Sequence, residues 1–205
     1  MIIKNGSLSY IGYLSAILAA MCSSTIGIFS IKAINAGLSG SSIAFYRCLI
    51  ALIIITTWLV LSNQFKQWLI YLKNFYLKIA GCALLGIFIM YTFETNAYRY
   101  TSIAIVVFIL LGSATLTTFI LSAILQKKRL HVYEIFSCLL AILGLSLVFG
   151  THGMSVVKTN LIGIILALIA GVGYGAFLAL SHALKIGTGL IVVNSLALFG
   201  VIYLF

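Results

Sequence analysis

The sequence predicts an all-α, polytopic transmembrane helical bundle with about seven visible spans. Two observations carry this prediction. The chain is 63% hydrophobic and only 7% charged, whereas a soluble domain carries about 25% charged residues. Its apolar residues also fall in uninterrupted runs of about 18–25, the length that a helix needs to cross a bilayer. Barrel strands would instead alternate apolar and polar residues, so helices are the expected way to satisfy the backbone in lipid.

The apolar runs define the elements in order, and the short connections between them predict antiparallel neighbours. The expected spans are 10–34, 41–62, 77–97, 101–125, 132–150, 161–184 and 188–205. The connection 64–78 has apolar residues at helical spacing, among them Phe65, Trp68 and Tyr76. We expect it to lie in the cytoplasmic interface with this aromatic face in the lipid.

Basic residues give the expected orientation. The N-terminus and the segments 63–78, 126–131 and 185–187 together hold eight Lys and Arg, against three on the other side. By the positive-inside rule the N-terminus is expected to be cytoplasmic.

A weak internal repeat aligns Gly12 with Gly163. The intervening helices number five, so the second copy would enter the membrane from the opposite face, as in inverted-repeat transporters. Residues 1–150 are then a first five-helix repeat and 161–205 the first two helices of a second, incomplete repeat. We therefore expect a fragment or early-terminated form of a ten-helix protein, which would form a homodimer if the chain is complete at 205 residues.

Three stretches carry a family resemblance. They are Phe45-Tyr46-Arg47 followed by Ala51-Leu52, the segment 97–125 beginning Ala-Tyr-Arg-Tyr-Thr-Ser-Ile-Ala, and the glycine-punctuated segment 144–150. The chain resembles the EamA family of the drug/metabolite transporter superfamily along essentially its whole length. The resemblance implies ten helices in two inverted repeats and the transport of small metabolites.

Arg47 and Glu94 are the sharpest polar signals. Arg47 lies about 9 Å deep in a span that starts on the outer side, and Glu94 lies near the end of a span that runs outward. Their similar depth predicts an ion pair. Arg47 is either an interfacial cation or a ligand for an anionic solute group, and Glu94 is either its partner or a protonatable coupling group.

Other candidates for solute binding are hydroxyl-bearing residues. These are Tyr13 and Ser24 in the first span, Thr117 in the fourth and Tyr174 in the sixth. The alternative is that such hydroxyls bond their own backbone carbonyls. Ala167, Gly171, Gly175, Ala179 and Ala183 recur every four residues and predict close helix packing.

The residues favour no chemistry beyond transport. The scattered basic residues lack a basic face, so we expect no nucleic-acid partner. Clustered ligands and a nucleophile–base arrangement are absent from the sequence, so we expect no metal, no cofactor and no enzyme activity. The predicted function is alternating-access transport of a small, amino-acid-like metabolite, with proton coupling as an open option; the partners are the lipid bilayer and the solute. The alternative is a truncated or accessory membrane protein that acts by helix packing alone.

Overall fold

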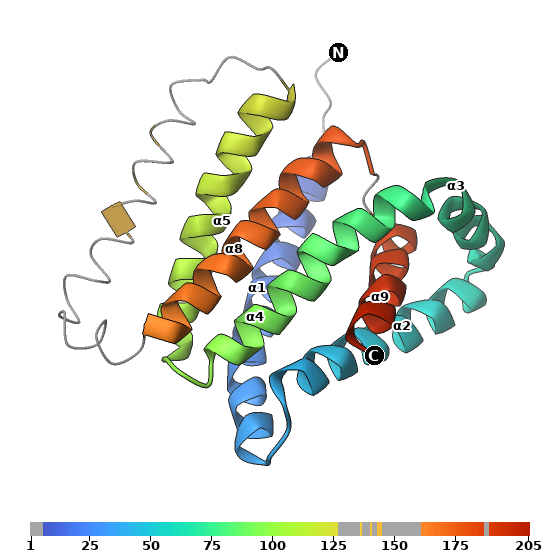
Figure 1. Cartoon of the computed structure of the whole chain (residues 1–205). Coiled ribbons are helices and arrows are strands. Elements are labelled where there is room, and N and C mark those ends of the chain that lie inside the picture. Colours follow the sequence, from blue (N-terminus) through green and yellow to red (C-terminus); the bar gives the residue numbers. More distant parts are fainter. Residues whose placement is uncertain (1–5, 127–135, 137–139, 141–142, 145–160, 187–188) are drawn as a thin grey trace.

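The computed structural model describes residues 6–126, 136, 140, 143–144, 161–186 and 189–205, and every element in this part of the chain is helical (Figure 1). The helices are α1 Gly6–Asn35, α2 Gly40–Leu61, α3 Phe65–Ala83, α4 Met90–Ala97, α5 Ile103–Gln126, α8 Leu161–Ala183 and α9 Leu190–Leu204. A π-helical turn, Leu84–Ile89, joins α3 to α4. The predicted all-α class is confirmed, and the expected span 132–150 lies outside the described residues.

Four helical runs among the described residues are long and apolar enough to cross a membrane. They are Gly40–Leu61, Phe65–Ala97, Ile103–Leu125 and Leu161–Ala183. Three of them coincide with the predicted spans 41–62, 101–125 and 161–184, and the fourth contains the predicted span 77–97 but begins earlier, at Phe65. Helix α9 is a shorter apolar helix at the place of the last predicted span. The molecule is a multi-pass helical bundle.

The expectation for residues 64–78 is wrong in one respect. Trp68 does not face lipid: it is 7% exposed, and its indole N–H donates to the Ser195 hydroxyl of α9 at 2.9 Å. The segment is also continuous with the span that follows, since α3 begins at Phe65 and runs through the π turn into α4 as one stretch of 33 residues. Its place in the membrane interface stays a prediction. The missing information was the position of α9, which covers this face of α3.

The helix directions follow from contacts along their length. Gly163 of α8 lies beside Thr101, just before α5, and Gly171 and Gly175 lie beside Leu110 and Ala114 within it, so α8 and α5 are parallel. Thr56 of α2 meets Asn194, whereas Phe45, earlier in α2, meets Phe205, so α9 runs antiparallel to α2.

In Figure 1 α8 also runs opposite to α1. The first two helices of the predicted second repeat thus run against α1 and α2, as an inverted repeat requires. The repeat itself remains a prediction.

The predicted small-residue row of α8 is a packing surface. A Cβ atom added to Gly171 would collide with Ser113 and come within 2.5 Å of the Leu110 carbonyl oxygen, and one at Gly175 would come within 2.5 Å of the Ala114 carbonyl oxygen. Glycine at these positions lets the α5 and α8 backbones touch, which is how helices associate in lipid.

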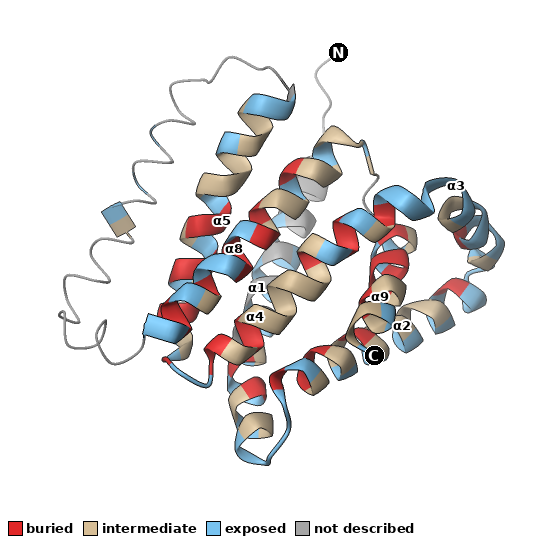
Figure 2. Cartoon of the chain, viewed as in Figure 1, coloured by how far each residue is buried: buried red, intermediate tan, exposed pale blue. Residues whose placement is uncertain are grey.

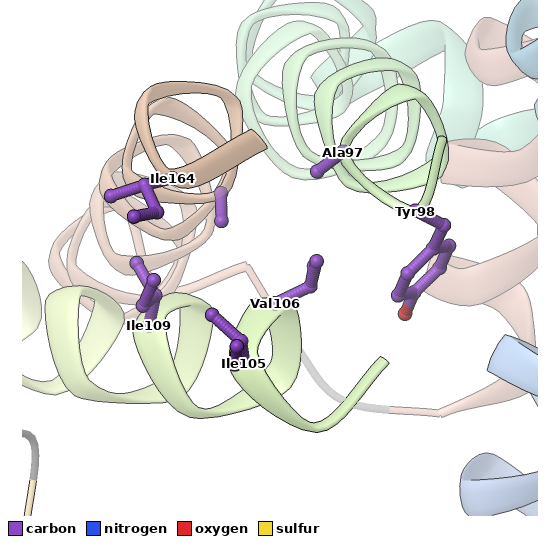
Figure 3. Packing of buried hydrophobic residues seen from close by; sticks show 7 residues of the cluster. Ala97, Tyr98, Ile105, Val106, Ile109 and Ile164 are labelled. Carbon is purple, nitrogen blue, oxygen red and sulfur yellow. The ribbon is translucent and has the colours of Figure 1, made fainter. Parts of the chain in front are cut away.

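Two buried clusters hold the helices together. One joins α4, α5 and α8 through residues that include Ala97, Val106 and Ile164 (Figure 3). The other joins α3 to α9 through residues that include Ile79 and Leu196. Figure 2 shows buried residues on the faces that these helices turn toward one another and exposed residues on their outer faces. The outer faces are largely apolar, as expected where lipid replaces water.

Candidate functional site

The predicted ion pair between α2 and α4 is confirmed. Arg47 Nη1 lies 3.6 Å from Glu94 Oε2, and the exposed side-chain fractions are 22% and 10%. The antiparallel packing of the two helices explains the meeting: Gly40, the first residue of α2, lies against the side chain of Asn96 near the end of α4. Arg47 lies two turns further along α2, at the level of Glu94.

Two tyrosines complete the cluster. The Arg47 guanidinium lies over the ring of Tyr91, 4.3 Å from its centroid, which is cation–π geometry. The Tyr98 hydroxyl donates to Glu94 Oε1 at 2.8 Å. Tyr91, Glu94 and Tyr98 are spaced three and four residues apart, so they share one face of α4. We call these residues and Arg47 the α2–α4 cluster.

The ion pair is not closed by a hydrogen bond. A separation of 3.6 Å is too long for one. Within the described part of the chain, Arg47 Nη1 and Glu94 Oε2 are buried and have no hydrogen-bond partner. The same holds for the hydroxyls of Thr92 and Thr95 on the same helix. Buried polar atoms are nearly always hydrogen-bonded, and exceptions gather at functional sites. The α2–α4 cluster therefore has donors and acceptors to spare for a ligand.

Tyr174 of α8 stacks on Phe177 with ring centroids 6.3 Å apart. Its role in solute binding stays a prediction.

The other predicted site residues lie elsewhere. Tyr13 is 68% exposed on α1. Thr117 faces Gly175 in the tight α5–α8 contact. Ser24 belongs to α1, and its side chain lies outside the described residues. The structure brings none of the three to the α2–α4 cluster, and their roles in solute binding stay predictions.

Tyr91 and Tyr98 are the members of the cluster that the sequence prediction missed. Their spacing around Glu94 was a signal that could have found them, since positions three or four residues away share a helix face. Among the described residues no group of three or more His, Cys, Asp or Glu is placed to hold a metal ion.

A buried, incompletely bonded ion pair between membrane-crossing helices is typical of proteins that move polar solutes or ions through a bilayer. The comparison with known families agrees with this class. The EamA-like transporter family matches residues 10–150, which is more than half of the chain. The chain belongs to this family, a family of membrane transporters. No curated protein and no solved structure matches it.

Proposed function

We propose that the protein transports a small, zwitterionic, amino-acid-like solute by alternating access, and that the α2–α4 cluster binds it. One observation carries the proposal: Arg47 Nη1 and Glu94 Oε2 are buried, opposite in charge and 3.6 Å apart, yet neither makes a hydrogen bond within the described part of the chain. A ligand that carries both a carboxylate and an ammonium group can take up both halves of such a pair.

The chemistry of each group supports this assignment. A guanidinium binds a carboxylate through two parallel hydrogen bonds, which is the geometry that Arg47 offers. Glu94 and the face of the Tyr91 ring both attract an ammonium group. A solute with one charge alone would leave the other half of the pair buried and unpaired, which costs several kcal/mol. The site therefore favours zwitterions over simple amines or acids.

Glu94 is also the candidate for proton coupling. Protonation would remove its charge and free Arg47 to hold a solute carboxylate, while the proton would compete with the solute ammonium for Glu94. The orientation that fits the basic residues places the N-terminus in the cytoplasm and the protein in an inner membrane, with the α2–α4 cluster in the outer half of the bilayer.

Flux into proteoliposomes tests the proposal. Wild type, Arg47→Ala and Glu94→Gln are assayed with a panel of amino acids, their decarboxylated amines and their deaminated acids, with and without an imposed proton gradient. Lys66→Ala, at an exposed position of α3, is the matched loss of a cation elsewhere.

We expect flux of amino acids that falls at least tenfold in Arg47→Ala and is unchanged in Lys66→Ala. Glu94→Gln should remove any response to the proton gradient. Flux that is the same in Arg47→Ala as in wild type would take Arg47 out of the site, and no flux of any compound would favour the accessory, non-transporting alternative.

A further inference from the structure

The π turn between α3 and α4 decides which residues face Arg47. The N–H of Met90 is shared between the carbonyl oxygens of Ile87 and Leu85, three and five residues earlier, whereas an α-helix would direct it to the residue four earlier. Such a turn accommodates one residue more than an α-helix would. Because of this extra residue, α3 before the turn and α4 after it present their side chains on one continuous face.

That common face can be followed along the whole run. Its residues are Ile79, Ala83, Ile87, Tyr91, Glu94 and Tyr98, and we call it the inner stripe. The first three pack against α9, and the last three form the α2–α4 cluster. Gly200 of α9 lies between the inner stripe and α2, since a Cβ there would touch both Ile87 of the stripe and Cys48 of α2.

An unbroken α-helix would present a different set of residues. It turns about 100° per residue. Continued from Ile79 and Ala83 without the π turn, it would bring Met90, Phe93 and Ala97 onto the inner stripe. Tyr91 and Glu94 would rotate by about 100° away from Arg47. The π turn therefore interrupts the regular hydrogen bonding of the helix and directs Glu94 toward Arg47.

Glycines surround the π turn where neighbouring helices cross it. A Cβ on Gly173 of α8 would lie 2.7 Å from Ile89 and 3.1 Å from the Leu85 carbonyl oxygen. One on Gly200 of α9 would lie 2.5 Å from Ile87, and Gly86 within the turn faces the ring of Phe177. The wider π turn fits between α8 and α9 because Gly173 and Gly200 have no side chains there.

We infer that the π turn Leu84–Ile89 is a two-register switch that makes and breaks the Arg47–Glu94 pair. In the π register Glu94 faces Arg47. In the α register the helix beyond the turn rotates by one residue, and Phe93 replaces Glu94. The ion pair holds the π register, so a solute or proton that takes Glu94 from Arg47 releases the turn. The link to transport rests on the proposed function, but the switch itself is a statement about helix register.

Disulfide cross-linking reads the register without any transport. In the π register a Cβ added at Gly40 would lie 2.6 Å from Oδ1 of Asn96, so the two positions are in contact. In the α register Thr95 takes the place of Asn96. In a background with the four native cysteines replaced, Gly40→Cys is combined with Asn96→Cys or with Thr95→Cys.

We expect strong 40–96 cross-linking in the otherwise unchanged chain and a weaker 40–95 product. Adding Glu94→Gln should raise the 40–95 product at least threefold. The matched control is deletion of Leu84, which is 41% exposed on the outer face of the turn. Removing one residue makes the helix α throughout while leaving the inner stripe aligned, so only 40–96 should form, with or without Glu94→Gln.

Absence of the 40–95 product in both backgrounds, with 40–96 intact, would show that the π turn is a fixed packing feature and would overturn the switch. Equal cross-linking of the two pairs in the deletion variant would overturn the register argument itself. Loss of solute flux with normal cross-linking would count against the proposed function alone, so the two failures are distinguishable.

Discussion

Replacing Glu94 with Gln removes the negative half of the buried pair but keeps a side chain of nearly the same shape. The Tyr98 hydroxyl can still donate to the amide oxygen, so the change acts mainly on Arg47. Removing the partner of a buried charge is destabilising because the remaining charge is desolvated without compensation. We therefore expect the free energy of unfolding to fall.

The structure sets the size of this effect. Two unit charges 3.6 Å apart attract by roughly 4–5 kcal/mol at an effective dielectric constant of about 20. Desolvation offsets part of this attraction. Arg47 also keeps its contact with the Tyr91 ring, worth about 1–2 kcal/mol when desolvated. We expect a net coupling of about 2 kcal/mol, well above the ~0.6 kcal/mol average of neutral hydrogen bonds between membrane helices.

A double-mutant cycle measures this coupling. The free energies of unfolding of wild type, Glu94→Gln, Arg47→Gln and the double variant are determined in mixed micelles titrated with dodecyl sulfate. Lys66→Gln, an exposed cation of α3, serves as the control and should change stability by less than about 0.5 kcal/mol. A coupling energy below about 0.5 kcal/mol would show that the two charges are neighbours without being partners.

Three further outcomes are expected. Gly171→Ala should destabilise the fold by about 1–3 kcal/mol in the same titration because its Cβ has no room against α5, whereas Gly81→Ala, with open space around it, should be neutral or stabilising; equal effects would contradict the tight helix contact. Brominated acyl chains should quench the fluorescence of Trp58, which is 60% exposed, in a Trp68→Phe variant, and quench Trp68 much less in a Trp58→Phe variant; the reverse order would return Trp68 to the lipid. Asn194→Ala should lower stability by about 1–3 kcal/mol, since it breaks a partly buried side-chain hydrogen bond between α9 and α2, and a neutral result would mean that this bond contributes nothing.

Sequence patterns were sufficient for most of the helices that the structure describes and for the ion pair. Run length and charge content fix where helices cross a bilayer, because no other backbone arrangement of such residues is satisfied in lipid. Arg47 and Glu94 could be paired in advance because span direction gives depth, and two charges at the same depth have a strong reason to meet. The packing row through Gly171 and Gly175 was readable for a similar reason, since lipid offers no hydrophobic drive and close approach needs small residues.

Properties that depend on a second helix were harder to predict. The burial of Trp68 follows from α9, which no local pattern places against α3. The turn of the Tyr91–Glu94–Tyr98 face toward Arg47 depends on the π turn, and the sequence Leu84–Ile89 reads as an ordinary apolar helix. Glycines of α8 and α9, which no local pattern places beside this turn, leave room for it.

The most direct test of the central claim, that Arg47 and Glu94 form the solute site, is the stabilisation that a transported zwitterion gives to the folded protein. A ligand that binds only the folded state at a hundred times its dissociation constant adds about 2.7 kcal/mol to the free energy of unfolding. We predict such an increment for wild type and for Lys66→Gln, and none for Arg47→Gln at the same concentration. An undiminished increment in Arg47→Gln would contradict the account, because the solute would then bind elsewhere.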